Sequence, residues 1–241
     1  MENGNFNIKM AGKKKLIRFE QLSTMPNVYQ NFNILKPALI NAEGEAVNLS
    51  EKWSSEHFKN DNPLILELAC GGGEYTVALA ERYPERNFIG IDIKGARIWK
   101  GANQALENNQ ANVAFCRIRI EQIAQFFGKE VDEIWITFPD PFYKKVRRRL
   151  THPIFLNHYR KILKDGGIVH LKTDDDMLFE FTMEVLEQEK IEVIYSNDNI
   201  YHRDFGTSDK PLYHNDLEVK TAYEKMHLRN RKTIKYVTFR L

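Results

Sequence analysis

Short apolar runs alternate with amphipathic segments from residue 64 to the end of the chain. Such runs predict buried strands, and an apolar residue every three or four positions predicts a helix with one buried face. The predicted strands are residues 64–69, 87–92, 113–118, 133–138, 168–173, 192–197 and 234–240. The predicted helices are residues 73–83, 94–108, 120–127, 152–164 (capped by Thr151) and 176–189. This order predicts an α/β fold with a mostly parallel sheet of seven strands and helices on both faces.

Two parts of the chain lack this regular pattern. Residues 13–63 show no sustained period beyond a little helix, and residues 1–12 are polar and Asn-rich, which is typical of disorder. We therefore divide the chain into a basic, partly disordered N-terminal extension, residues 1–60, and one domain, residues 61–241. Residues 198–216 are rich in Asn, Asp, Gly and Pro and predict a long loop, of a kind that is often functional.

The first predicted strand of the domain carries the first candidate site. It ends in Ala-Cys-Gly-Gly-Gly, and the next strand ends in Asp92. Gly71 and Gly73 let the loop backbone approach a ligand, and an acid after the second strand can accept hydrogen bonds from ribose hydroxyls. Glu67 would repel a pyrophosphate but suits a cationic ligand. S-adenosylmethionine carries an ammonium and a sulfonium and no phosphate, so the stretch favours a methyltransferase. A tight strand-to-helix turn with two surface acids is the alternative.

Composition narrows the class of protein. The chain has 241 residues, 42% of them hydrophobic, which is enough for a core in one domain. No apolar run reaches the length of a membrane span and no signal peptide opens the chain, so we expect a cytoplasmic protein with no membrane contact. Cys70 and Cys116 lack CxxC spacing and are expected to be free thiols. His152, His158 and His170 lack the spacing of metal ligands, so we expect no metal.

Charge is distributed unevenly, although the formal net charge is only +2. Residues 144–149 hold five bases, and residues 220–241 hold seven bases against Glu224. Residues 1–20 are also basic, whereas residues 174–192 hold eight acids against one lysine. This segregation predicts an anionic partner larger than a metabolite, with ordinary solvated faces as the alternative.

A second candidate site lies where the predicted strand 133–138 ends. Residues 138–143 read Phe-Pro-Asp-Pro-Phe-Tyr and lead directly into the basic run. Asp140 is therefore expected at the mouth of the ligand crevice, between two prolines that stiffen its backbone. Phe142 and Tyr143 can stack on a base while the lysines and arginines hold phosphates. This combination suits nucleic acid better than a small substrate, and a proline turn before a solvated basic helix is the alternative.

Taken together, these motifs resemble one family. The chain contains, in order, Glu67-Leu68-x-Cys70-Gly71-x-Gly73, Gly90-Ile91-Asp92, Phe138-Pro139-Asp140-Pro141-Phe142-x-Lys144-Lys145, Thr173-Asp174 and Thr221-x-Tyr223-Glu224. This order resembles the bacterial tRNA (guanine-N7-)-methyltransferases over roughly residues 60–241. The resemblance implies a Rossmann-like class I sheet, S-adenosylmethionine as cofactor, and methyl transfer to N7 of a guanine in the tRNA variable loop. It implies tRNA as partner of a monomer or homodimer.

The resemblance also assigns roles to single residues. Position by position, it implies the catalytic acid Asp140 and the cofactor-binding residues Glu67, Gly71, Gly73 and Asp92. The implied substrate-binding residues are Lys144, Asp174, Thr221, Tyr223 and Glu224.

The sequence departs from the family pattern at three single positions and in the length of the basic run. Ala69 stands where the family usually has glycine, so the loop turn must tolerate a methyl group. Phe142 replaces the usual tryptophan, and the basic run after Lys145 is shorter than usual. Ile118 stands where an acid or amide often binds the adenine side of the cofactor, so adenine binding would rest on backbone groups and apolar contact.

Guanine N7 carries no proton, so the implied reaction needs no general base. We expect Asp140 to act by orientation and charge, stabilising the positive charge that develops on the guanine, with Asp174 able to share this task. The expected phosphate contacts are Lys13–Lys15, Lys144–Arg149 and Arg229–Lys235. Two alternatives remain open: a methyltransferase acting on amino groups of adenine or protein, and a tRNA-binding protein of the same fold without catalysis.

Overall fold

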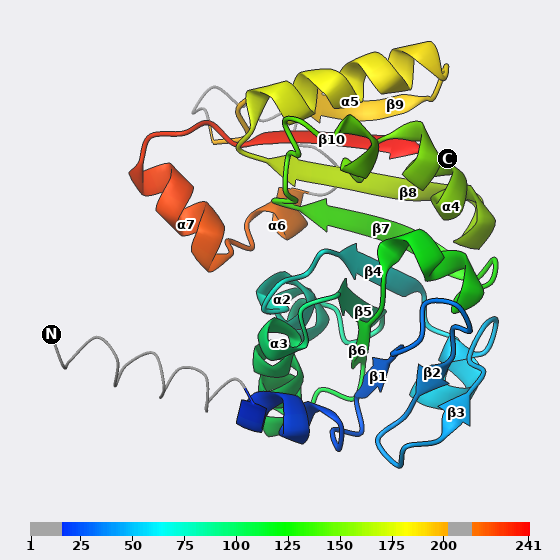
Figure 1. Cartoon of the computed structure of the whole chain (residues 1–241). Coiled ribbons are helices and arrows are strands. Elements are labelled where there is room, and N and C mark those ends of the chain that lie inside the picture. Colours follow the sequence, from blue (N-terminus) through cyan, green and yellow to red (C-terminus); the bar gives the residue numbers. More distant parts are fainter. Residues whose placement is uncertain (1–15, 202–213) are drawn as a thin grey trace, which may run out of the picture.

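The structure, a computed structural model, describes residues 16–201 and 214–241. Ten strands form one sheet in the order β3-β2-β1-β6-β5-β4-β7-β8-β10-β9 (Figure 1). Seven of them match the predicted strands: β4 (Leu64–Leu68), β5 (Asn87–Asp92), β6 (Val113–Arg117), β7 (Val131–Thr137), β8 (Leu163–Thr173), β9 (Val193–Asn197) and β10 (Lys235–Arg240). The predicted fold class is confirmed, but the predicted number of strands is wrong.

The three additional strands come from the predicted N-terminal extension. They are β1 (Val28–Gln30), β2 (Leu39–Ile40) and β3 (Ala46–Val47). Strands this short contain no readable alternation, which is why the sequence did not reveal them. β1 pairs in parallel with β6, and the buried Trp53 donates from Nε1 to the carbonyl of Phe126 at 3.0 Å. The extension therefore shares one sheet with the predicted domain, while residues 1–12 and Lys13–Lys15 lie outside the described residues.

The strand order creates a crevice at one edge of the sheet. The chain passes from β4 to β5 and β6 on one side, and then returns to β7 on the other side of β4. Ligands bind where such a reversal separates the loops that follow neighbouring parallel strands. β8 continues the parallel set, whereas β10 runs antiparallel to both β8 and β9. The arrowheads of β4, β7 and β8 point toward the edge that carries the last two helices (Figure 1).

Helices cover both faces of the sheet as predicted. Their bounds are α2 (Glu74–Arg82), α3 (Gly95–Glu107), α4 (Pro153–Ile162) and α5 (Asp176–Gln188). The segment predicted as helix 120–127 is a 3-10 helix, η2 (Ile120–Gln125). Residues 16–22 are helical, η1 (Trp53–Phe58) is a π-helical turn, and η3 (Val146–Arg148) is a short 3-10 turn.

The cap of α4 differs from the prediction. His152 is the N-cap, since its Nδ1 accepts the Ile154 N–H at 3.2 Å. Thr151 is buried instead, and its hydroxyl bonds that of Thr182 in α5 at 2.8 Å. Pro153 opens the helix, since a missing N–H costs nothing at that position.

Two helices near the C-terminus were not predicted. α6 (His214–Leu217) begins in the segment predicted as a loop, residues 198–216, of which residues 202–213 lie outside the described residues. α7 (Ala222–Arg229) is capped by Thr221, whose hydroxyl accepts the Glu224 N–H at 3.1 Å. Thr-x-x-Glu is the spacing of a capping box, so the sequence did contain a signal for this helix.

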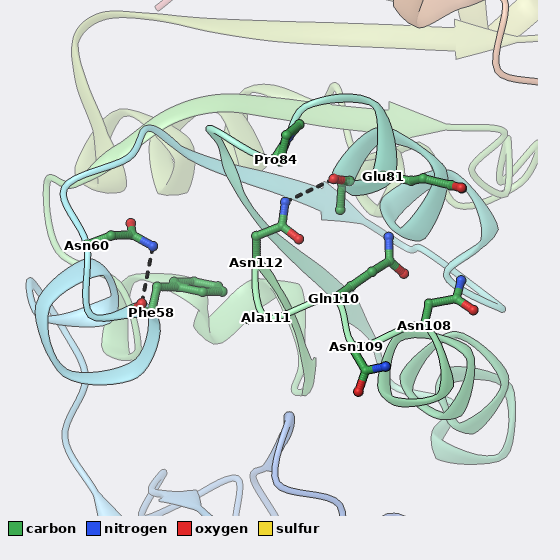
Figure 2. Close-up of a pocket in the computed structure, with 10 residues that line it drawn as sticks. Phe58, Asn60, Glu81, Pro84, Asn108, Asn109, Gln110, Ala111 and Asn112 are labelled. Atoms are coloured by element: carbon green, nitrogen blue, oxygen red, sulfur yellow. Dashed lines mark hydrogen bonds between the residues drawn. The ribbon is translucent and has the colours of Figure 1, made fainter.

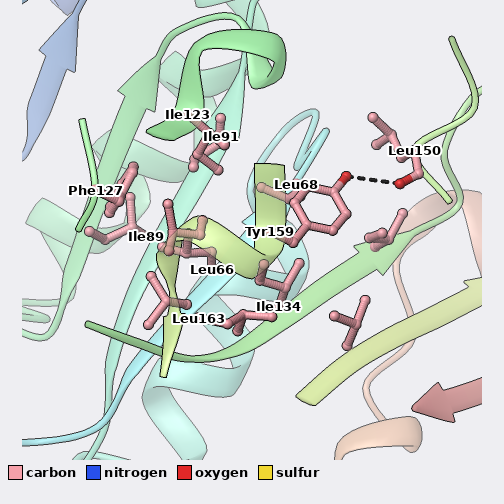
Figure 3. Packing of buried hydrophobic residues seen from close by; sticks show 14 of the residues in the cluster. Leu66, Leu68, Ile89, Ile91, Ile123, Phe127, Ile134, Leu150, Tyr159 and Leu163 are labelled. Atoms are coloured by element: carbon pink, nitrogen blue, oxygen red, sulfur yellow. Dashed lines mark hydrogen bonds between the residues drawn. The ribbon is translucent and has the colours of Figure 1, made fainter. Parts of the chain in front are cut away.

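The core has two parts, one on each face of the sheet. Leu66 and Leu68 of β4 face α4 and α5, whereas Ile65 faces α2 and α3, as the two-residue period of a strand requires. Tyr159 of α4 packs among the first group, and its hydroxyl donates to the carbonyl of Leu150 at 2.9 Å (Figure 3). Packing on both faces holds the strand tips, and the loops that follow them, in fixed places.

A hollow of about 620 Å³ lies at the opposite edge, where the parallel strands begin (Figure 2). Amide side chains line it, but several of them fasten the turns around it. Asn112 donates to the carbonyl of Ala80 at 3.0 Å, and Asn60 donates to the carbonyl of Phe58 at 3.2 Å. These groups stabilise the fold at the edge away from the crevice. Within the described ranges, no helix is long and apolar enough to cross a membrane.

Candidate active site

A cleft of about 750 Å³ opens at the carboxyl ends of β4 and β7. It brings together residues from both candidate sites, although they are far apart in the sequence. The predicted site residues that line it are Glu67, Gly71, Asp140, Asp174, Thr221 and Tyr223. Gly73, Asp92, Lys144 and Glu224 are not among its lining residues.

Glu67 is a buried carboxylate on the wall of the cleft, with only 4% of its surface exposed. One oxygen accepts the N–H of Thr76 at 2.9 Å and the hydroxyl of the same residue. The other accepts the hydroxyl of Thr137 at 2.5 Å. Burial raises the pKa of Glu67 to about 7, although these three hydrogen bonds lower it. A cation bound beside this carboxylate would favour its charged form.

The glycine loop is tied to the end of β5. Asp92 accepts the Gly71 N–H at 3.0 Å through Oδ2 and the Lys94 N–H at 2.8 Å through Oδ1. Gly71 has φ 57°, in the region that favours glycine. Ala69 has the same φ, so the methyl group at this departure from the family is accommodated at a cost of about 1–2 kcal/mol.

Gly73 has a different role from Gly71. It is the N-cap of α2, with φ 69°. A Cβ there would lie 2.5 Å from the ring of Phe115. This glycine is therefore required for packing between the loop and β6, rather than for direct approach of a ligand.

Asp140 is exposed on a constrained loop. Its Oδ1 accepts the Phe142 N–H at 3.1 Å. Phe138 and Phe142, on either side of it, have φ values of 48° and 45°. Bulky residues adopt this conformation at a cost of about 1–3 kcal/mol each, and such strain is concentrated at functional sites. The loop thus projects a carboxylate into the cleft with little freedom to move.

Asp174 lies across the cleft in a cluster of charges. Its Oδ2 accepts a hydrogen bond from Lys232 Nζ at 2.6 Å and lies 3.2 Å from His227 Nδ1. The ring of His227 stacks on Phe138 at 6.2 Å and lies 5.7 Å from that of Tyr223, which is 60% exposed. These contacts connect α7 with the loop that carries the second candidate site.

Glu224 points into the protein. Both it and Lys172 of β8 have fully buried side chains, and Lys172 Nζ lies 2.8 and 2.9 Å from the two carboxylate oxygens. Tyr201 donates to the same carboxylate at 2.6 Å, and Lys172 also donates to the carbonyl of Leu217 at 2.9 Å. Glu224 therefore fastens α7 to the sheet, and its predicted contact with substrate stays a prediction. Lys144 is exposed outside the cleft.

Several residues of the site carried no signal in the sequence. Thr76 and Thr137 donate hydrogen bonds to Glu67, and no sequence pattern predicts a hydroxyl at either position. Lys94 and Arg97 line the cleft on the side of α3, and neither residue was singled out from the sequence. Ile118 is buried in the core with 2% exposure.

Cys70 and Cys116 are free thiols, as expected, and both are buried. Burial raises the pKa of each thiol well above its usual value. Neither group is suited to act as a nucleophile.

Comparisons with known proteins agree with this geometry. A family described as putative methyltransferase matches residues 61–236. The tRNA (guanine-N(7)-)-methyltransferase of Christiangramia forsetii is 43% identical over 235 residues, covering 96% of this chain and 100% of that protein. The protein of the same name from Porphyromonas gingivalis is 43% identical over 221 residues, covering 91% and 86%.

Solved structures show the same fold at low sequence identity. The 16S rRNA methyltransferase KamB has a TM-score of 0.59 at 13% identity, over 82% of this chain and 96% of that one. An antibiotic-related methyltransferase has a TM-score of 0.59 at 16% identity, over 82% and 97%. At these identities the likeness concerns the arrangement of strands and helices alone.

Proposed function

This chain belongs to the tRNA (guanine-N7-)-methyltransferase family, and from that premise we propose that it transfers a methyl group from S-adenosylmethionine to N7 of a guanine in the tRNA variable loop. One observation carries the proposal beyond family membership. The cleft places a buried carboxylate, Glu67, and an exposed carboxylate, Asp140, on the tips of the two strands that flank the topological switch point. Glu67 suits a cationic cofactor, and Asp140 suits a purine that becomes positively charged as it accepts the methyl group.

The residues of the first candidate site fit S-adenosylmethionine. Glu67 would bind the cationic part of the cofactor, and Gly71 would let the loop approach it. Asp92 would accept hydrogen bonds from the ribose while it holds the loop through the Gly71 N–H. Gly73 would act indirectly, by allowing the loop to pack against Phe115. When bound, the cofactor supplies a methyl group already activated on a sulfonium, so the proposed reaction needs no metal ion.

Asp140 would orient the guanine and stabilise the charge that develops on it. A fixed carboxylate close to a purine that becomes positive lowers the barrier electrostatically. The same carboxylate can accept hydrogen bonds from the N1–H and amino group of guanine, which adenine cannot donate. Since N7 carries no proton, Asp140 has no proton to remove. Alignment of N7 with the methyl carbon and the sulfur would supply most of the rest of the rate enhancement.

The rest of the cleft suits a large anionic substrate. Tyr223 and Thr221 line it on the side of α7, and Asp174 lines it as well. Phosphates of the tRNA would be attracted by Lys94, Arg97 and the exposed Lys144 while the guanine unstacks from its neighbouring bases. The predicted contact of Glu224 would be indirect, through the position of α7. We propose that the protein acts on tRNA in the cytoplasm as a monomer or homodimer.

The test is methyl transfer from labelled S-adenosylmethionine to unmodified tRNA transcripts, followed by nucleoside analysis. The expected product is 7-methylguanosine, and it should disappear when the variable-loop guanine is replaced by adenine. A different methylated nucleoside would contradict the proposal and favour an amino methyltransferase. No transfer together with tight tRNA binding would favour a binding protein without catalysis.

A further inference from the structure

The five bases of residues 144–149 are not equivalent in the structure. Lys144, Lys145, Arg147 and Arg148 are exposed, as a phosphate-binding surface requires. Arg149 is buried, with only 5% of its surface exposed. A residue this buried is poorly placed to contact a phosphate, and burying a guanidinium is costly unless the protein supplies partners for it.

Arg149 has partners on the loop that carries Asp140. Its Nε donates to the carbonyl of Pro141 at 3.1 Å. The guanidinium also lies over the ring of Phe181 in α5, and its central carbon is 4.4 Å from the centre of that ring. A guanidinium is planar, so one group can stack on a ring and donate in its own plane at the same time.

The residues that follow Arg149 are held in place, so the backbone of Arg149 is fixed. The carbonyl of Leu150 accepts the hydroxyl of Tyr159 at 2.9 Å (Figure 3). Thr151 bonds Thr182 of α5 at 2.8 Å. Both neighbours are anchored to helices on the same face of the sheet. Any movement of Arg149 would therefore have to come from its own side chain.

We propose that Arg149 is a positioning residue that holds the Asp140 loop for methyl transfer, whereas Arg148 belongs to the RNA-binding surface. Pro141 directly follows Asp140, and Phe138 and Phe142 keep the loop in a strained conformation. Without the donor at its carbonyl, the loop can relax toward ordinary backbone angles and move the carboxylate away from the guanine. This inference rests on the proposed function for its kinetic consequences.

The kinetic test compares substitutions at two adjacent arginines. Arg149→Met should lower kcat on the order of ten- to a hundred-fold, as expected when a catalytic group is misplaced by about 1 Å. Its Kd for tRNA and the salt dependence of binding should stay within two-fold of wild type. Arg148→Met should do the reverse, weakening tRNA binding and reducing the slope of log Kd against log salt by about 1.

Lysine at each position separates charge from geometry. A point charge is sufficient to attract a phosphate, so Arg148→Lys should retain most of the wild-type affinity. A lysine cannot stack and donate in one plane, so Arg149→Lys should be as slow as Arg149→Met. Rescue of kcat by Arg149→Lys, or a reduced salt slope in Arg149→Met with unchanged kcat, would overturn the proposal.

A readout without substrate keeps this inference separate from the proposed function. The Phe142 and Lys145 amides are hydrogen-bonded within the loop, so hydrogen exchange of residues 140–145 should be faster in Arg149→Met and unchanged in Arg148→Met. Should Arg149→Met fail to fold, Phe181→Leu keeps every charge and removes only the stacked ring. It should speed exchange in the same segment, and unchanged exchange in the folded variants would contradict the proposal, whatever the protein methylates.

Discussion

At the scale of single residues, the raised pKa of Glu67 is the most distinctive property of the site. Its pKa of about 7 in the free protein means that the carboxyl is half protonated near neutral pH. Desolvation disfavours the charge, and hydrogen bonds from Thr76 and Thr137 recover only part of that cost. A cationic cofactor would lower this pKa, so binding would release a proton wherever the pH lies between the free and bound values.

The resulting prediction concerns cofactor affinity and pH. Affinity for S-adenosylmethionine should fall on the order of ten-fold between pH 7.5 and 5.5, since the charged form is lost as the pH falls through about 7. Titration calorimetry without tRNA, in buffers of different ionisation enthalpy, would also detect the released proton. Glu67→Gln should bind weakly at every pH, and a pH dependence that survives this substitution would assign the effect to another group.

Asp140 gives a second prediction at this scale. Asp140→Asn should lower kcat on the order of a hundred- to a thousand-fold, because it removes a charge from the place where positive charge develops. Its cofactor affinity should remain that of wild type. Single-turnover methyl transfer across pH and in heavy water would complete the test. A solvent isotope effect together with an acid limb on the chemical step would show that Asp140 removes a proton.

At the scale of elements, one buried ion pair fastens α7 to the sheet. Lys172 and Glu224 join β8 to this helix, and Thr221 caps its first turn. Tyr223 on the same helix lines the cleft, so anything that releases α7 also changes the site. A buried pair adds little net stability compared with apolar residues, but loss of one partner leaves an uncompensated charge.

The changes in the free energy of unfolding caused by substitutions in this pair should therefore be strongly non-additive. Lys172→Met should lower the free energy of unfolding by about 3–5 kcal/mol, since it leaves the Glu224 carboxylate buried without its cation. The double variant Lys172→Met with Glu224→Leu should recover most of that loss. Urea denaturation of both single variants and the double variant measures the coupling. Additive losses would show that the pair contributes little to the attachment of α7.

At the scale of the whole molecule, the distribution of charge should govern how tRNA binds. Residues 174–192 are acidic, and Asp174 and Asp175 line the cleft together with the cations Lys94 and Arg97. The exposed bases of residues 144–148 directly follow the lining residue Tyr143. Long-range attraction to phosphates is sequence-independent and is screened by salt. It should therefore set affinity and orientation, while Asp140 selects the base.

The corresponding prediction is a steep dependence of tRNA affinity on salt. Between 50 and 200 mM salt, affinity should fall by about a factor of a thousand if six or more phosphates are neutralised. A double variant Lys94→Ala with Arg97→Ala should reduce the slope by about 2 without changing which nucleoside is methylated. Filter binding at several salt concentrations gives the slope directly. A slope near zero would contradict binding through phosphates.

The sequence by itself determined the elements that depend on local pattern. The apolar runs of β4 to β10 and the amphipathic faces of α2 to α5 are properties of neighbouring residues, so they could be predicted from period alone. The motifs around Glu67, Asp92 and Asp140 could be recognised for the same reason. The Thr-x-x-Glu that begins α7 was also local, but it was interpreted as part of a family motif.

Only the tertiary structure decided which of these residues meet. β1 to β3 are too short to form a pattern and exist because β6 offers an edge with which β1 can pair. Burial raises the pKa of Glu67, and the two threonines whose hydrogen bonds lower it in part, Thr76 and Thr137, lie on other elements. Arg149 and Glu224 look like surface charges in the sequence, yet packing buries both. Burial and charge pairing depend on contacts between distant residues, and these contacts exist only after the chain has folded.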